Sequence, residues 1–228
     1  AAGARIFEGS EVTRIESGSA PVARCARGSV KAKSLVLCGN AYLGDLAPPI
    51  RSKIMPVGTY IGATEPLGEN RARTAIPGNL AVSDCNFVVN YYRLSPDHRM
   101  LFGGRVSYST IVPPNLPRAM RRKMLQVFPD LIDVRFDYTW GGFVAITVER
   151  TPHIGRLGDN VYFAQGFSGQ GVAMTGIAAK LIAEVIAGES GRFELMTRLP
   201  HTTFPGGRLM RTPTLALAML WYRLRDLL

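Results

Sequence analysis

Cysteine is scarce in this sequence: only Cys25, Cys38 and Cys85 occur among 228 residues. They form no CxxC pair, and an odd number of thiols leaves one over. This spacing argues against a zinc site and against a disulfide framework. We therefore expect no metal site and a reducing compartment, which points to the cytoplasm.

Long uncharged hydrophobic runs are also missing. The apolar stretch Val172–Gly188 contains Lys180 and Glu184, and Leu215–Tyr222 is too short to cross a bilayer. We expect no transmembrane segment. The chain opens without a charged-then-apolar leader, but it also opens at Ala1 without a methionine, so we expect a fragment in which a missing leader carries little weight.

Acidic residues are few, since 17 Asp and Glu oppose 27 Lys and Arg, for a formal net charge of +10. Such a balance invites a nucleic-acid-binding interpretation. The cations are scattered, however, and the densest cluster contains no interleaved aromatic residue, so we interpret it as a solvated helix face. That cluster is Arg118, Arg121, Arg122 and Lys123. We expect no nucleic-acid partner, and the nucleic-acid alternative rests on charge alone.

The overall composition is that of a globular protein, with 46% hydrophobic and 19% charged residues, which excludes disorder, collagen and coiled coil. The 24 glycines and 15 prolines favour many short elements joined by tight turns. The hydrophobic patterns divide the chain into four segments: 1–47, 48–146, 147–190 and 191–228.

The first segment predicts a β-meander that returns into a larger sheet. Its expected strands are Arg5–Glu8, Val12–Glu16, Val22–Cys25 and Ser34–Leu37. The last of these is a continuous apolar run, as in buried parallel strands, and Gly39 follows the carboxyl end where α/β folds place ligands. The second segment predicts an antiparallel sheet that carries the helix Pro117–Phe128.

The third segment predicts a strand, Val161–Ala164, a glycine-rich turn, and a helix, Val172–Ala187. We expect five apolar side chains of this helix to face inward: Ile177, Leu181, Ile182, Val185 and Ile186. The fourth segment ends in another expected helix, Thr212–Leu228, with Pro213 at its first position. This terminal helix has an apolar side that could pack on the domain or on a partner.

The turn Gly166–Gly171 is the strongest single signal for a site. Its glycines would let backbone approach a ligand closely, and the helix start that follows favours partial negative charge. Close strand-to-helix packing explains such a turn equally well, and it is not a GxGxxG dinucleotide fingerprint. Two further glycine pairs, Gly103–Gly104 and Gly141–Gly142, lie within expected strands and mark places where something flat, or another backbone, passes close by.

Taken together, five motifs resemble the C-terminal part of the FAD-dependent D-amino-acid oxidase and glycine/sarcosine oxidase superfamily. In chain order they are Val36–Ala41, Leu101–Gly104, Trp140–Gly142, Arg150–Gly155 and Gly166–Gly171. Two further stretches are similar to the γ-glutamylputrescine oxidoreductase branch, namely Cys38–Leu43 and the tail from Phe204–Gly207 through Leu220–Asp226. The resemblance covers nearly the whole chain.

The resemblance implies an α/β (α+β) fold, in which the C-terminal part of a FAD-binding Rossmann-like domain carries an inserted mixed or antiparallel substrate domain at 48–146. It implies an enzyme that oxidises the C–N bond of a small-molecule amine with FAD, releasing an aldehyde and ammonia, with dioxygen as acceptor and hydrogen peroxide as product. A glycine or D-amino-acid type oxidase and a non-catalytic truncated homologue are the alternatives.

The resemblance also implies site residues. Val12, Gly39 and Asn40 would border the adenosine half of FAD, while Gly141, Gly142, Ile154 and Gly155 would line the flavin ring. The polar edge of the ring would face the turn and helix start, formed by Gly166, Phe167, Ser168, Gly169, Gln170, Gly171 and Val172. Substrate would contact Tyr60, Tyr91 and Arg105. For His153 a structural role is the preferred interpretation, and the resemblance assigns no catalytic residue.

Four departures from the family pattern refine these expectations. The place where sarcosine-type enzymes attach flavin through cysteine is near Ile146, so we expect non-covalent FAD. Their carboxylate-binding lysine corresponds to Ala173, and Gln170 stands where histidine is frequent, which favours a longer amine such as γ-glutamylputrescine. No GxGxxG follows a strand in this sequence, so we expect the N-terminal half of the FAD site to be missing and the chain to bind FAD poorly alone.

Overall fold

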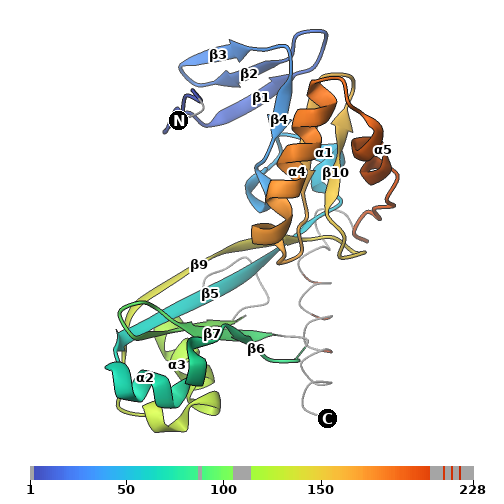
Figure 1. Cartoon of the computed structure of the whole chain (residues 1–228). Coiled ribbons are helices and arrows are strands. Elements are labelled where there is room, and N and C mark those ends of the chain that lie inside the picture. The colour runs from blue at the N-terminus through green and yellow to red at the C-terminus, as the bar shows by residue number, and fades with distance from the viewer. Residues whose placement is uncertain are drawn as a thin grey trace. The chain divides into compact units, whose positions relative to one another are not determined.

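The structure is a computed structural model that describes residues 3–86, 89–104 and 114–205, together with Pro213, Leu217 and Trp221. These residues form two compact units (Figure 1). Unit 1 contains Ala1–Met55 and Val144–Phe204, and unit 2 contains Pro56–Phe143. Among the described residues, unit 1 contains two clusters of buried hydrophobic residues, and unit 2 contains one. The expected helix Thr212–Leu228 lies outside the described residues except at the three isolated positions.

Unit 1 is built on a three-stranded sheet whose order is β10-β11-β4. Strand β4 (Leu35–Leu37) runs parallel to β11 (Val161–Gln165), and β10 (His153–Leu157) pairs with β11 in the antiparallel sense. The parallel arrangement predicted for the apolar run before Gly39 is therefore confirmed. All five residues of β11 are buried, and alternate side chains enter two different cores, as in a strand covered on both faces.

Helix α4 (Gly171–Ile186) covers one face of this sheet by packing against β11. Its buried residues Ala178, Leu181, Ile182 and Val185 recur at helical spacing. The sequence placed Ile177 and Ile186 inward as well, which is wrong: their side chains are 53% and 46% exposed. Because they are nine residues apart in the helix, these two lie on opposite flanks of the buried stripe of α4. Unit 1 also contains η1 (Asn40–Tyr42), α1 (Pro48–Arg51) and α5 (Gly191–Thr197).

The meander of unit 1 is a separate three-stranded antiparallel sheet, β1-β2-β3. Its strands are β1 (Val12–Glu16), β2 (Val22–Cys25) and β3 (Gly28–Lys31). The expected strand Arg5–Glu8 is absent, because that exposed stretch has no strand beside it, and β3 takes the third place instead. All four residues of β3 are exposed, so burial gave no alternation by which to predict it.

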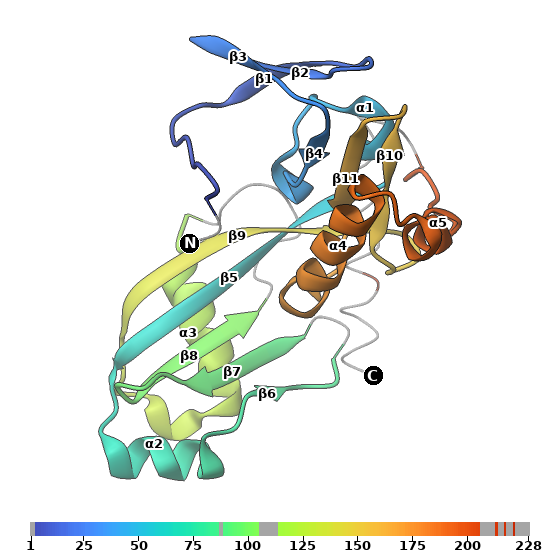
Figure 2. The same ribbon diagram turned by 45° about the horizontal axis from the view of Figure 1, so that its top comes forward.

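Unit 2 is a five-stranded sheet of order β6-β7-β8-β5-β9, and helices α2 and α3 pack on one face of it (Figure 2). Helix α3 matches the predicted Pro117–Phe128 to within one residue at each end, and Pro117 lies in its first turn. The strands are β5 (Met55–Pro66), β6 (Val82–Ser83), β7 (Asn90–Leu94), β8 (Arg99–Gly104) and β9 (Phe136–Ile146). The helical elements are α2 (Glu69–Ala75), η2 (Pro77–Asn79), α3 (Leu116–Val127) and η3 (Pro129–Leu131).

The boundaries between the two compact units fall within β5 and β9, after Met55 and after Phe143. Helix α1 belongs to unit 1 because it contributes Ile50 to the core formed with β4 and β11. The segment expected as 191–228 begins with α5, whose Phe193 is buried in the core of α4.

The described residues were compared with the requirements of a membrane span, a metal site and a disulfide bond. None of the helices in the described ranges combines the length and apolar character needed to cross a membrane. Within those same ranges no three His, Cys, Asp or Glu residues are placed to hold a metal ion. The three cysteines are free thiols.

Candidate functional site

The turn between β11 and α4 has the strained backbone that its glycines anticipate. Gly166 and Gly169 adopt φ angles of +70° and +97°, and Ser168 adopts +51°, a region that non-glycine residues rarely enter. A Cβ added to Gly166 would lie 2.5 Å from Cγ2 of Thr147. This position therefore requires glycine for two independent reasons, its dihedral angle and its packing.

Hydrogen bonds from the end of β9 hold this turn in place. The backbone N–H of Ser168 donates to the carbonyl of Ala145 at 2.9 Å, and the N–H of Thr147 donates to Oγ of Ser168 at 3.3 Å. Within the turn, Oγ of Ser168 donates to the carbonyl of Gly166 at 3.2 Å. Ser168 thus exchanges hydrogen bonds with the chain at the end of β9.

Asn40 connects this turn to the end of β4. Its Oδ1 accepts a hydrogen bond of 2.9 Å from the backbone N–H of Gly166, across 126 residues of sequence. Asn40 itself has φ of +46°, which asparagine tolerates better than most residues. Two motifs that the sequence singled out separately, Gly39–Asn40 and Gly166–Gly171, therefore meet at one corner of unit 1.

Helix α4 begins at this corner with its N-terminus uncapped by any side chain. Gln170 is the N-cap residue and makes no side-chain cap hydrogen bond, and the first turn contains no acidic residue. The side chain of Val172 is fully exposed. The first amides of a helix carry a partial positive charge, so this end suits an electron-rich carbonyl or a phosphate group.

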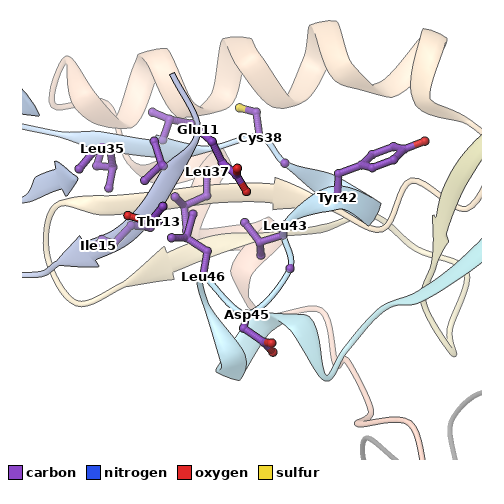
Figure 3. Close-up of a pocket in the computed structure, with 15 residues that line it drawn as sticks. Glu11, Thr13, Ile15, Leu35, Leu37, Cys38, Tyr42, Leu43, Asp45 and Leu46 are labelled. Carbon is purple, nitrogen blue, oxygen red and sulfur yellow. The ribbon is translucent and has the colours of Figure 1, made fainter. Parts of the chain in front are cut away.

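A cavity of about 580 Å³ lies between the meander and the end of β4, and Val12 and Gly39 both line it (Figure 3). Its size is that of a small-molecule site. The apolar part of its wall includes Leu35, Leu37, Leu43 and Leu46. The structure thus brings together two predicted residues that come from different sheets.

Polar groups at this cavity include Glu11 directly before β1, Thr13 within β1, and Asp45 beyond η1. Asp45 forms an ion pair with Arg51, whereas Glu11 is exposed. Burial raises the pKa of the Cys38 thiol, so this cavity-lining thiol is held in its neutral form. Glu11 was not predicted as a site residue, although its position directly before Val12 could have indicated it.

Three residues expected at the flavin ring, Gly141, Ile154 and Gly155, pack against side chains of the protein itself. A Cβ on Gly141 would lie 2.3 Å from the ring of Tyr60, and one on Gly155 would lie 2.8 Å from the ring of Phe163. Ile154 is 1% exposed and points into the core with α4. The flat objects beside these two glycines are therefore aromatic side chains, and the Ile154 side chain has no access to a ligand. Gly142 is half-buried on β9 beside Gly141, in unit 2.

The tyrosines expected to contact substrate lie on opposite faces of the unit 2 sheet. Tyr60 is 2% exposed and packs within the core under the helices, and its contact with substrate stays a prediction. Tyr91 hydrogen-bonds Oγ1 of Thr59 at 2.8 Å, and its ring covers Gly103, where a Cβ would lie 1.9 Å from Cε2. Thr59 neighbours Tyr60 along β5, so its side chain is on the other face. Arg105 lies outside the described residues.

His153 is held by neighbours of its own unit. Its Nδ1 lies 3.2 Å from Nε2 of Gln165, and its ring packs edge-on against Phe163 and stacks on His201. Burial lowers the pKa of His153 to about 4, and the charges of His201 and Lys53 act in the same direction. The interpretation of His153 as a structural histidine is compatible with these contacts. Gln165 and His201 were not anticipated, because neither belongs to a motif that sequence reasoning recognises.

Comparison with known proteins places this corner in context. A γ-glutamylputrescine oxidoreductase from Escherichia coli (strain K12) is 44% identical over 225 residues, which cover 98% of this chain and 53% of that protein. A probable oxidoreductase OrdL from Rhizobium meliloti (strain 1021) is 38% identical over 226 residues, with 99% and 52% covered. The chain therefore spans about half the length of these relatives and aligns as a C-terminal portion.

Solved structures share the fold at low sequence identity. L-proline dehydrogenase from P. horikoshii has a TM-score of 0.67 at 22% identity, over 84% of this chain and 53% of that one. Glycine oxidase from Geobacillus kaustophilus also scores 0.67, at 17% identity, over 88% and 54%. The mixed α/β fold predicted from the sequence is confirmed. Residues 1–185 match the DAO family, described as FAD dependent oxidoreductase, so the chain belongs to the DAO family of FAD-dependent oxidoreductases.

Proposed function

We propose that this chain supplies the C-terminal half of a FAD-dependent amine oxidoreductase whose substrate resembles γ-glutamylputrescine. The observation that carries the proposal is the joined corner of unit 1: Gly39 lines the cavity near Val12, and its neighbour Asn40 is bonded to the glycine-rich turn. The hydrogen bond between Asn40 and Gly166 thus connects the cavity to the turn that leads into the start of α4. FAD is a molecule with an adenosine end and a ring end.

The residues present fit FAD at both ends. At the adenosine end, the cavity combines an apolar wall with the half-buried Val12 and the exposed Gly39. At the ring end, the uncapped start of α4 and the exposed Val172 leave amides directed away from the protein. The dipole of α4 would stabilise negative charge on a reduced ring placed there. Residues 166–172 would hold that polar edge, and Ser168 would keep the turn rigid through its bonds to β9.

The reaction that we propose converts an amine, water and dioxygen into an aldehyde, ammonia and hydrogen peroxide. FAD would supply the acceptor for the two electrons and the hydrogen removed from the carbon beside the nitrogen. The contribution of this chain would be to hold the cofactor and to orient the amine. Tyr91 is our candidate for a substrate contact, because its hydroxyl lies on the sheet face opposite the unit 2 helices and is held by Thr59.

We propose that FAD is bound without a covalent link. The position that corresponds to the flavin-linking cysteine of sarcosine-type relatives is Ile146, a buried residue with no nucleophile. The free thiol nearest the corner in sequence is Cys38, whose pKa is raised by burial, so the fraction in the reactive thiolate form is small at neutral pH.

We propose that the remaining half of the enzyme docks on the open side of unit 1. Among the described strands, β4 is paired on one edge only. Beside it lies an apolar groove of about 480 Å³, lined by Val36, Ala164, Phe167, Ile182 and Ile186 among others. Strand β4 is parallel to β11, so a further parallel strand can continue the sheet beyond β4. The helix that follows this added strand would cover the flank of α4 that bears Ile186.

A chimera tests this proposal. The part of the E. coli relative that this chain does not match would be fused in front of Ala1, and the product would be assayed with γ-glutamylputrescine. We expect turnover with peroxide release, and no turnover by the 228-residue chain alone. A folded, flavin-loaded chimera that oxidises glycine or D-alanine but not γ-glutamylputrescine would favour the oxidase alternative. A flavin-loaded chimera inactive with all three amines would favour the non-catalytic alternative.

A further inference from the structure

A cluster of polar side chains lies behind the glycine-rich turn and does not line the cofactor cavity. It gathers residues from the α1–β5 connection, the β9–β10 connection, β10, β11 and residues 199–204, which we call the tail segment. Its members are Lys53, Glu149, His153, Gln165 and His201. The rings of His153 and His201 stack with centroids 4.2 Å apart and an interplanar angle of 26°. The tail segment is therefore joined to β10 by a contact between two imidazoles.

Backbone hydrogen bonds fasten the tail segment on both sides of this contact. The carbonyl of His201 accepts a hydrogen bond from Nζ of Lys53 at 2.8 Å. The N–H of Thr202 donates to Oε1 of Glu149 at 2.8 Å. Although burial acts to raise the pKa of Glu149, the hydrogen bonds from Thr202 bring it below its ordinary value, so this carboxylate is charged at neutral pH.

Gln165 determines the protonation state of His153. The amide nitrogen of Gln165 donates to the carbonyl of Ile50 at 2.6 Å and lies 3.2 Å from Nδ1 of His153, so both of its hydrogens are engaged. Rotating the amide would place its oxygen against the Ile50 carbonyl. Nδ1 of His153 must therefore accept a hydrogen bond, which requires a neutral ring that carries its proton on Nε2.

The charged groups around His153 agree with this neutral state. Burial is the largest factor that lowers its pKa, to about 4, and His201 from the tail segment and Lys53 after α1 lower it further. Glu149 alone acts in the opposite direction. Gln165 is 1% exposed, so the side of the His153 ring that faces this amide is turned away from solvent.

The same histidine touches the glycine-rich turn. A Cβ built on Gly166 would lie 3.7 Å from Cβ of His153, and Gln165 is the residue directly before Gly166. His153 and Gln165 therefore place the histidine cluster directly beside the backbone that starts the turn. Asn40 holds the N–H of that same Gly166 from the other side.

We propose that His201 is a positioning residue: by stacking on the neutral ring of His153 it fastens the tail segment behind the glycine-rich turn and holds the turn in the shape that receives the cofactor. The role of the turn rests on the function proposed above. This stacking contact between His201 and His153, which we call the clamp, is present in the cofactor-free chain, so its test does not require flavin.

The first test is ¹⁵N NMR of the imidazoles in the 228-residue chain, which contains only three histidines, His98, His153 and His201. We expect the His153 signal, assigned by its loss in His153→Gln, to show an unprotonated Nδ1 at pH 7 and to remain neutral as the pH is lowered toward 4. In His201→Ala the same ring should titrate at a pH about one unit higher or more, because it loses both cover and a positive neighbour. A protonated Nδ1 at pH 7, or a titration that His201→Ala leaves in place, would overturn the proposal.

The second test measures release of the tail segment by trypsin cleavage after the exposed Arg198 at pH 7.5. His201→Ala should be cleaved about tenfold faster, whereas His201→Phe, which keeps a stacking ring, should be cleaved at the wild-type rate. His98→Ala is the matched control, because His98 lies in the β7–β8 turn of unit 2. Equal rates for Ala and Phe at position 201 would contradict the clamp even if the imidazole titration behaved as expected.

These outcomes separate the clamp from the proposed function. If the chimera is active but His201→Ala changes neither imidazole titration nor cleavage, only the clamp fails. If both readouts change but the chimera never binds flavin, the clamp holds and the proposed function fails. When the two hold together, His201→Ala should weaken FAD binding by the chimera about tenfold, and His201→Phe should restore it.

Discussion

Oδ1 of Asn40 accepts a hydrogen bond of 2.9 Å from the backbone N–H of Gly166, and this one contact joins the two parts of the site that sequence reasoning found separately. Both residues have positive φ angles, +46° and +70°. The bond therefore connects two strained turns, one after β4 and one after β11, at the end of a parallel strand pair. Ligand sites in α/β folds lie at such strand ends.

The first prediction concerns that bond. Asn40→Ala should lower the free energy of unfolding by about 2 kcal/mol, because it leaves the Gly166 N–H unpaired and places alanine at a positive φ. Asn40→Gly loses the acceptor but tolerates the angle, and should lose about 1 kcal/mol. Urea unfolding checks both. Asn40→Asp keeps an acceptor and is the matched control; a loss as large as that of Asn40→Ala would contradict the assigned bond.

The second prediction concerns the packing of Gly166. Gly166→Ala should destabilise the chain by about 2–3 kcal/mol, because the new methyl group meets Cγ2 of Thr147 as well as an unfavourable φ. Gly169→Ala has a similar φ but nothing within 4 Å, so it should cost only about 1 kcal/mol.

A double-mutant cycle isolates the clash. Thr147→Ser removes Cγ2 and keeps the hydroxyl that donates to the carbonyl of Thr151. Combined with Gly166→Ala it should recover about 1 kcal/mol in urea unfolding. Strict additivity of the two substitutions would show that Thr147 is not the obstacle.

The sequence predicted those elements whose signals are local. The apolar run at Leu35–Leu37, the proline-started helix α3 and the glycine turn before α4 each carry their pattern within a few residues. Strand β3 and α5 carry no such pattern, because their residues are mostly exposed or belong to a short helix completed by tertiary packing of Phe193. These elements appear only once their neighbours are placed.

The site was predictable where backbone conformation dominates and not where partners are distant in sequence. The positive φ angles of Gly166 and Gly169 were predictable, because glycine adopts such angles without steric cost. Nothing in the sequence around Gly141 or Gly155 reveals that the ring of Tyr60 or Phe163 fills the space beside them. The inward assignment of Ile177 similarly failed, because hydrophobicity alone cannot say whether an apolar flank packs within this chain or against another segment.

The third prediction concerns substrate contact by Tyr91. Tyr91→Phe should raise the KM of the active chimera for its amine about tenfold and leave stability nearly unchanged, because the ring still covers Gly103. Thr59→Val removes the other partner of the 2.8 Å hydroxyl pair and is the control for a purely structural bond. Equal, small effects of both substitutions on KM would assign the pair to structure only.

The fourth prediction concerns pH. The folded-state pKa of His153, about 4, lies below the ordinary value of 6.5, so the unfolded chain binds more protons between these two values. Stability is therefore fully present above pH 6.5 and is lost as the pH falls toward 4. Because the ring is partly exposed, we expect this loss to be about 1–2 kcal/mol rather than the full value of the shift.

Thermal unfolding from pH 7 to pH 4 checks this direction. The denaturation midpoint of the wild-type chain should fall more steeply with acid than that of His153→Gln, which cannot take up the proton. Parallel curves for the two proteins would show that another group controls acid stability.

The proposed function requires that the corner of unit 1 where Asn40 is bonded to Gly166 forms half of a flavin site. The most direct measurement is the visible absorption spectrum of the purified chimera beside that of the 228-residue chain, with protein concentration determined independently. We predict about one FAD per chimera, released on denaturation because it is not covalently bound, and little or none on the chain alone. A well-folded chimera without flavin, or a full flavin spectrum on the chain alone, would contradict the account.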